Sequence, residues 1–327
     1  MAMYRHGLRP ANTRARDYSV IVAGQSLARA LTNRSSWPAL CAQLRAGGLT
    51  AALVNQVNTA VGGSVADKWS ANSPATNTTF WYDSVTSSNG PLLTAALAAI
   101  GATAGDALVF DLGQTESLYV PNVNSVANFR AAWRKTAEAL LATVPSKLIV
   151  VPVVGRRSDA SAPGVQLVRE GQIAEMAALA AGGATVRRFD TYDLSLIDTV
   201  HPDQPGYVVY GSRLGRCIRG LYSPPKIAAV TRGAGALNLV LDAAVTSAVG
   251  SVAQAAGARL ADGTYKFMDV TVTSATTMTA APVAGDAWSV ENVSEFLWPY
   301  DRLSRASILT LPRNAAGDPI ESCSISL

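Results

Sequence analysis

The stretch Val20-Ile-Val-Ala-Gly-Gln-Ser-Leu27 decides the fold, because it joins a short apolar run to a glycine turn and then to a polar side chain. A continuous apolar run of this length is typical of a strand that is buried on both faces of a parallel sheet. The strand is expected to end at Gly24. Ser26 then stands at the carboxyl edge of the sheet, where open α/β sheets hold their ligands.

On both sides of this stretch, strand-like and helix-like segments alternate along the chain. Further strands are expected at residues 51–57, 107–112, 147–154 and 184–189, and helices at residues 35–45, 91–100, 126–144, 164–181 and 206–221. Strands separated by helices need crossover connections, which give a parallel sheet covered on both faces. The sequence therefore predicts an α/β fold: a three-layer αβα sandwich around a parallel five-stranded sheet, as in flavodoxin-like proteins.

The pattern changes at Ser223-Pro-Pro225, after which short alternating runs are punctuated by glycine, proline and Asp-Gly. We expect a sandwich domain at 18–223 and a small β-rich accessory domain at 224–327. Residues 1–17 form a basic N-terminal arm, interpreted either as an exposed arm or as a nucleic-acid or targeting segment. No stripe of alternating aromatic and basic residues accompanies it, so no nucleic-acid partner is expected.

Composition excludes several classes of site and partner. The net charge is only +4, and three distant cysteines predict free thiols rather than a disulfide framework. The two histidines, His6 and His201, are too few for a histidine-rich metal site, so no metal is expected. No secretory signal or membrane-spanning run is visible, which predicts a cytoplasmic or virion-associated protein without a membrane partner.

A second polar motif, Asp198-Thr-Val-His-Pro202, follows the last predicted strand. The segment is short, and Pro202 prevents an ordinary helix from continuing through it. His201 could accept the proton of Ser26, while Asp198 fixes the imidazole tautomer. The alternative is a histidine packed against a loop, with an unrelated aspartate nearby.

Two further motifs follow other strands. Gly62-Gly-Ser64 would let the backbone approach a ligand and present N–H groups, unless it is an ordinary turn. Gly113-Gln-Thr-Glu-Ser117 places polar side chains at the same sheet edge, unless it is a helix cap.

These four motifs, in this order at strand ends, resemble the SGNH hydrolases, also called the GDSL esterase family. Gly24-Gln-Ser26, the glycine pair followed by Trp69, and Asp198-x-x-His-Pro202 are similar to the branch of sialate O-acetylesterases and related carbohydrate acetylesterases. The resemblance covers about residues 18–220.

The resemblance implies a Ser26–His201–Asp198 triad that needs no cofactor. It also implies an oxyanion hole made by the N–H groups of Ser26 and Gly63 and a side chain of the third motif. There the chain departs from the wider pattern Gly-x-Asn-Asp. Thr115 occupies the asparagine position, so the third donor is Thr115, Gln114 or neither. Loss of one such donor costs about 10²–10³ in rate.

Four side chains near these motifs are candidates for binding substrate: Gln25, Trp81, Glu116 and Arg156. Phe80-Trp-Tyr82 lies in the middle of a long polar segment, where it could stack on sugar rings or anchor the segment to the protein. Arg156 or Arg157 could bind the carboxylate of an acidic sugar, or the two could be solvated.

The function predicted from the sequence is a serine carbohydrate O-acetylesterase with an acetylated glycan as substrate. A glycan-binding module of a phage-like particle, with a hydrolase fold but little turnover, is the alternative from another class. In either case the C-terminal part could join copies of the chain or a particle. A lipid esterase or thioesterase is the third reading, disfavoured because the loops near the site are polar.

Overall fold

The computed structural model describes residues 17–31, 34–46, 54–300 and 310–327. Its centre is a parallel five-stranded sheet in the order β2-β1-β6-β7-β8. The strands are β1 (Tyr18–Gly24), β2 (Val54–Asn58), β6 (Ala107–Asp111), β7 (Leu148–Val153) and β8 (Thr185–Asp190). The predicted basic arm lies outside the described residues, apart from Asp17.

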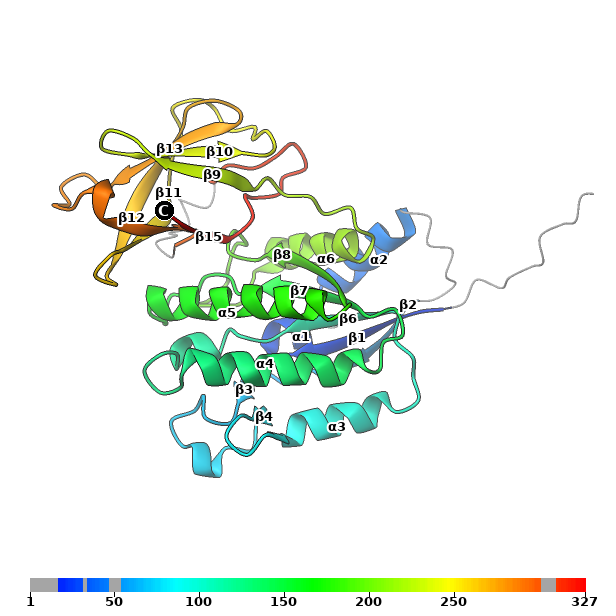
Figure 1. The fold of residues 1–327 in the computed structure, drawn as a ribbon. Helices are drawn as coiled ribbons and strands as arrows, with labels where there is room; N and C mark the ends of the chain where they lie inside the picture. The colour runs from blue at the N-terminus through cyan, green and yellow to red at the C-terminus, as the bar shows by residue number, and fades with distance from the viewer. Residues whose placement is uncertain (1–16, 32–33, 47–53, 301–309) are drawn as a thin grey trace, which may run out of the picture.

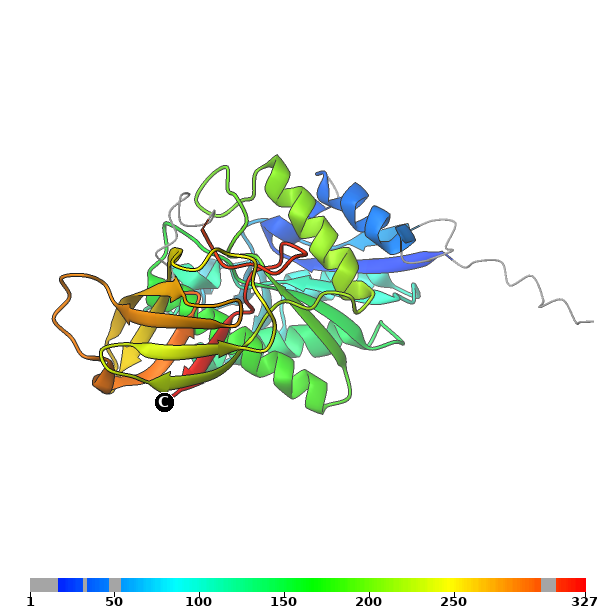
Figure 2. The same ribbon diagram turned by 90° about the horizontal axis from the view of Figure 1, so that it is seen from above.

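Helices cover both faces of this sheet, as Figures 1 and 2 show. Successive residues of a strand point to opposite faces, so Val20 and Val22 pack under one helical layer while Ile21 and Ala23 pack under the other. The first layer contains α1 (Ser26–Leu31), α2 (Ser36–Ala46) and α6 (Gln204–Ile218); the second contains α3 (Pro91–Ile100), α4 (Val126–Leu141) and α5 (Ala162–Ala181). Together with the sheet they form the predicted αβα sandwich.

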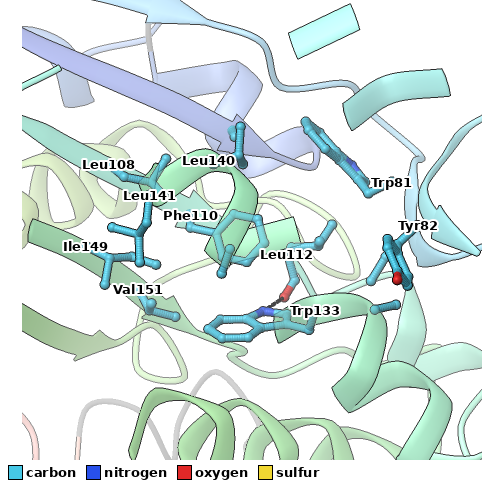
Figure 3. Close-up of a cluster of buried hydrophobic side chains, with 14 of the residues drawn as sticks. Trp81, Tyr82, Leu108, Phe110, Leu112, Trp133, Leu140, Leu141, Ile149 and Val151 are labelled. Carbon is cyan, nitrogen blue, oxygen red and sulfur yellow. Dashed lines mark hydrogen bonds between the residues drawn. The ribbon is translucent and has the colours of Figure 1, made fainter. Parts of the chain in front are cut away.

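Aromatic side chains fill the second layer near the carboxyl edge of the sheet (Figure 3). The rings of Phe110 and Trp133 lie 4.9 Å apart, and Trp133 Nε1 donates to the carbonyl of Leu112 at 3.0 Å. This bond fixes the end of β6, where the third polar motif begins.

The long polar segment around Phe80-Trp-Tyr82 contributes to a small three-stranded sheet. This sheet consists of β3 (Val65–Asp67), β4 (Phe80–Asp83) and β5 (Ser88–Asn89). Trp81 on β4 is fully buried, and its Nε1 donates to Ser64 Oγ at 3.1 Å. The aromatic run therefore anchors this segment to the protein, as one of the two interpretations held.

The C-terminal part forms an antiparallel seven-stranded sheet in the order β15-β14-β11-β12-β13-β10-β9. Its strands are β9 (Ile227–Arg232), β10 (Leu237–Leu241), β11 (Val252–Leu260), β12 (Tyr265–Val272), β13 (Thr277–Pro282), β14 (Val293–Trp298) and β15 (Cys323–Ser326). The predicted β-rich character of this part is confirmed. No helix among the described residues is long and apolar enough to cross a membrane.

Buried contacts join the αβα sandwich to the seven-stranded C-terminal sheet. We call this contact region the seam and define it by Arg169, Tyr192 and Asp193 and their partners in the C-terminal part. Arg169 Nη1 donates to the carbonyl of Pro299 at 2.7 Å, and the Tyr192 hydroxyl donates to the carbonyl of Ile320 at 2.6 Å. All three side chains are at most 5% exposed.

Candidate active site

The turn after β1 holds Ser26 at the carboxyl edge of the parallel sheet. Gly24 has a φ of +135°, and a Cβ added to it would lie 1.9 Å from the carbonyl oxygen of Asp111. Only glycine fits such a close approach of two strand ends. The N–H of Gln25 then donates to that same carbonyl at 2.8 Å, which leads the chain into α1 at Ser26.

Ser26, His201 and Asp198 form a continuous hydrogen-bonded chain. Ser26 Oγ lies 2.8 Å from His201 Nε2, and His201 Nδ1 lies 2.7 Å from Asp198 Oδ2. With Asp198 ionised, Nδ1 carries the imidazole proton and Nε2 can accept the Ser26 hydroxyl proton. This is the connectivity that activates a serine nucleophile.

Asp198 is held as an anion by the turn that contains His201. Its Oδ1 accepts the backbone N–H groups of Val200 at 2.8 Å and His201 at 2.7 Å. Burial by itself would raise the pKa of the Asp198 carboxyl, but these N–H groups and the His201 ring outweigh it and lower the pKa. Asp198 therefore stays ionised at neutral pH, as an imidazole-orienting group must.

The glycine turn lies beside the serine. A Cβ added to Gly62 would lie 3.8 Å from Ser26 Cβ, and Gly63 has a φ of +72°, a backbone conformation that side chains disfavour. The backbone of this turn is therefore near enough to Ser26 to face a bound ester. The Gly63 N–H as oxyanion donor stays a prediction.

Gln25 joins three chain segments beneath the site. Its Oε1 accepts the N–H groups of Gly113 and Thr115, each at 3.2 Å. Its Nε2 donates to the carbonyl of Ser64 at 2.7 Å and to Glu116 Oε2 at 2.9 Å. Every polar atom of this amide is thus used to align the serine turn, the glycine turn and the third motif.

Glu116 and Gln25 were both predicted to bind substrate, and that prediction is wrong. Glu116 is fully buried and Gln25 is 1% exposed. Glu116 Oε1 also accepts the backbone N–H of Ala66, so both carboxyl oxygens face protein donors. Burial raises the pKa of Glu116 to about 7, even though these hydrogen bonds favour the charged form. Gln25 and Glu116 therefore hold the loops around the site in place and do not contact a substrate.

Gln114 does not point at the serine. Its Nε2 donates to Asp111 Oδ1 at 2.7 Å, and its side chain is 3% exposed. Tyr210 donates to the other oxygen of Asp111 at 2.7 Å, and burial raises the pKa of this carboxyl to about 6. The expectation that Gln114 donates to the oxyanion is therefore corrected, and Thr115, which is half-buried, stays the predicted third donor.

The prediction that Trp81 binds substrate is also corrected. Trp81 has no exposed surface to offer a sugar. Arg156 is half-buried, and its Nη2 donates to the carbonyl of Leu194 at 3.2 Å on the segment that leads to His201. Its role in binding substrate stays a prediction. The neighbouring Arg157 is paired with Asp159 at 2.6 Å and donates to the carbonyl of Gln114 at 3.1 Å. These arginines brace the loops around the site.

A cleft of about 490 Å³ opens over Ser26 and His201. Sequence reasoning missed several of the side chains that line it, including Arg29, Arg34, Ile197 and Tyr207. Arg29 could have been found, because it lies three residues after Ser26 on α1 and residues at this spacing share a helix face. Arg34 and Tyr207 come from segments far apart in the sequence, and no local pattern links them.

Comparison with known proteins supports the fold. The structure of a carbohydrate acetylesterase from Xanthomonas citri matches with a TM-score of 0.65 and 13% sequence identity, over 94% of this chain and 80% of that chain. This likeness extends into the C-terminal sheet and, with the five-stranded parallel sheet, confirms the predicted αβα sandwich with an added β-rich part. No protein-family model and no curated protein sequence matches the chain.

Two further structures match the chain less well. A protein from Arabidopsis thaliana matches with a TM-score of 0.44 and 15% identity, over 64% of this chain and 99% of its own. An acetylxylan esterase from Geobacillus stearothermophilus matches with a TM-score of 0.42 and 12% identity, over 62% and 94%. At these TM-scores neither adds to the assignment of the fold.

Proposed function

We propose that the chain is a serine esterase that removes O-acetyl groups from a carbohydrate. The observation that carries the proposal is the hydrogen-bonded chain from Ser26 through His201 to Asp198, with distances of 2.8 and 2.7 Å, at the floor of a cleft. A carbohydrate is favoured as the substrate because the cleft is lined mainly by polar side chains. The Xanthomonas citri protein of similar fold is described as a carbohydrate acetylesterase.

The reaction follows from the geometry of these three residues. Ser26 Oγ attacks the acetyl carbonyl carbon while His201 Nε2 takes its proton. The negative charge on the carbonyl oxygen is held by the backbone N–H groups of Ser26 and Gly63. His201 returns the proton to the sugar oxygen as that bond breaks, leaving Ser26 acetylated. Water, deprotonated by His201, then releases acetate and restores the serine.

Asp198 acts through His201 in both steps. Its carboxylate keeps the imidazole in the tautomer that can accept the serine proton, and it stabilises the imidazolium that forms. Loss of the Asp198 carboxylate should therefore lower the rate through His201.

The first test measures hydrolysis of p-nitrophenyl acetate across pH 5–9 by wild type, Ser26→Ala and Ser251→Ala. Ser251 lies in a turn of the C-terminal part, so the last variant controls for loss of a serine hydroxyl elsewhere. Wild type and Ser251→Ala should turn over the ester. Ser26→Ala should lose at least about 10³-fold in kcat.

Equal rates in wild type and Ser26→Ala would overturn the proposal.

A second candidate function, a glycan-binding module with little turnover, is favoured by one observation: the Gln114 amide is turned away from the serine and towards Asp111. Glycan binding that persists without any Ser26-dependent ester cleavage would support this second reading.

A further inference from the structure

The proton that His201 returns in the proposed reaction determines where the sugar must lie. This proton goes to the sugar oxygen as its bond to the acetyl group breaks, so the sugar occupies the His201 side of the cleft. That side is lined by Ile197, Pro202, Gln204 and Tyr207. The surroundings of Tyr207 and Ile197 show what kind of group this side of the cleft can bind.

Tyr207 brings a hydroxyl group to the cleft from a ring that is otherwise buried. The residue is 5% exposed and lies in the first turn of α6, with the Arg34 guanidinium carbon 5.9 Å from the centre of its ring. Among the described residues, no group forms a hydrogen bond with this hydroxyl. It is not sealed from solvent, as the hydroxyl of Tyr222 is, so it opens onto the cleft that Tyr207 lines.

The next tyrosine of the same helix shows the contrast. The hydroxyl of Tyr210 donates to Asp111 Oδ2 at 2.7 Å, as most hydroxyl groups of buried residues do to some partner. Burial raises the pKa of Tyr207, so its hydroxyl keeps its proton at neutral pH and can donate it in a hydrogen bond. A fixed donor beside the candidate nucleophile is thus available to a ligand.

Ile197 presents an apolar side chain to the same cleft and is 76% exposed. Its backbone is fixed, because its N–H donates to the carbonyl of His201 at 2.9 Å and Leu196 forms a β-bridge with Pro202. Single exposed apolar side chains are common on protein surfaces. This one, however, directly precedes Asp198 in the turn that holds the histidine. The C–H face of a sugar ring could cover it and remove its apolar surface from water.

We infer that Tyr207 and Ile197 form the subsite for the sugar ring of the ester. The Tyr207 hydroxyl donates to a free hydroxyl of the sugar, and Ile197 packs against the C–H face of the ring. The inference rests on the proposed function and deepens it, because it names the residues by which that site distinguishes a sugar ester from other acetyl esters. A site that binds a substrate hydroxyl discriminates against an analogue without it, since the polar group of the site then loses its partner.

The test pairs two acetyl esters that share a ring and differ in their free hydroxyls. One is a methyl glucoside with a single acetyl group, chosen as the positional isomer that wild type cleaves fastest. The other is the tetrahydropyranyl acetate with its ester at the corresponding position and no hydroxyl. Wild type should prefer the glucoside. Tyr207→Phe should lower kcat/KM for the glucoside by about three- to tenfold, mainly through KM, and leave the tetrahydropyranyl ester unchanged.

Ile197→Ala should lower kcat/KM for both esters alike, by about threefold, because both rings offer C–H surface. Its matched control is Val249→Ala, which shortens an apolar side chain that is 70% exposed in a turn of the C-terminal part. Tyr82→Phe, in the small sheet, controls for the loss of a tyrosine hydroxyl outside the cleft. Both controls should keep the wild-type values. Wild-type values in Ile197→Ala would overturn the packing contact.

The outcomes separate the inference from the proposed function. Ser26-dependent cleavage of both esters without preference for the glucoside, or a preference that Tyr207→Phe leaves intact, would overturn the inference and leave the esterase standing. An equal loss on both esters in Tyr207→Phe would mean that the hydroxyl only supports the shape of the site, which also contradicts the inference. If no ester is cleaved in a Ser26-dependent way, the proposed function is wrong, and the subsite that rests on it is wrong with it.

Discussion

At the scale of single residues, Glu116 is a carboxyl group held in the interior directly beneath the candidate site. Its pKa rises from 4.5 to about 7, chiefly through burial. The folded protein therefore binds this proton more tightly than the unfolded chain does. By linkage, this group makes the free energy of unfolding fall as the pH rises from about 4.5 to about 7.

We expect Glu116→Gln to remove that part of the pH dependence, on the order of 3 kcal/mol between pH 4.5 and 7.5. Urea unfolding of wild type and variant at both pH values measures it. Glu291→Gln, at an exposed position, should keep the wild-type slope. Identical slopes in all three proteins would show that Glu116 ionises in the folded state as it does in the unfolded chain.

The residue scale also shows what a sequence can and cannot reveal about a site. Ser26, Asp198 and His201 were predictable because only two histidines exist and one follows the last strand at a short distance from an aspartate. Gln25 and Glu116 were assigned the wrong role because the identity of a polar residue does not tell whether its side chain faces solvent or the protein interior. Only the neighbours that surround them, Ser64 and Ala66 among others, settle this.

At the scale of elements, α6 packs closely against α2 through a glycine. A Cβ on Gly211 would lie 2.0 Å from the carbonyl oxygen of Ser36 and 2.6 Å from its carbonyl carbon, both backbone atoms that cannot move alone. The position of α6 against the parallel sheet thus depends on its close contact with α2.

Gly211→Ala should therefore destabilise the protein by about 1–3 kcal/mol, although alanine is the better helix former. The midpoint of denaturant unfolding measures the loss. Ser212→Ala, the next position on the same helix, provides the control and should be close to neutral. A more stable Gly211→Ala variant would mean that the two helices separate at little cost.

Most elements were predicted because long apolar runs and helix-spaced apolar residues set them. The strands of the parallel sheet and the helices α2 to α6 were found with ends displaced by a few residues, apart from residues 51–53, which lie outside the described residues. The small sheet β3-β4-β5 was missed, because its strands are two to four residues long and lie among Ser, Thr and Asn. So short a strand has too few residues to show an alternating pattern.

At the scale of the whole molecule, the seam couples the stability of the αβα sandwich to that of the C-terminal sheet. Tyr192 follows β8, yet its side chain belongs to the apolar core of the C-terminal sheet. Asp193 is paired with Arg213 at 2.6 Å and also with Arg313 of the C-terminal part. The predicted boundary at 223/224 therefore marks a change in the sequence pattern only. Side chains from before this boundary pack into the core of the part that follows it.

Tyr192→Phe should lower the free energy of unfolding of the entire protein by about 1–3 kcal/mol. The change leaves the buried carbonyl of Ile320 and the Trp298 indole N–H, which lies 3.1 Å from the lost hydroxyl, without this partner. Fluorescence and circular dichroism should report one shared, shifted transition. Tyr82→Phe, in the small sheet far from the seam (Figure 1), is the control. Two separate transitions would contradict a cooperative seam.

The position of Tyr192 sets a rule for building chimeras. A breakpoint placed at the prolines 224 and 225 looks natural from the sequence, but it would separate a graft from Tyr192, an aromatic ring of its core that is supplied from upstream. A foreign C-terminal sheet joined there would pack against Tyr192, Asp193 and Arg169, and it would lack the groups that these side chains bind in this protein. Recombinant fusions of this protein should therefore exchange residues 190–193 together with the sheet they serve.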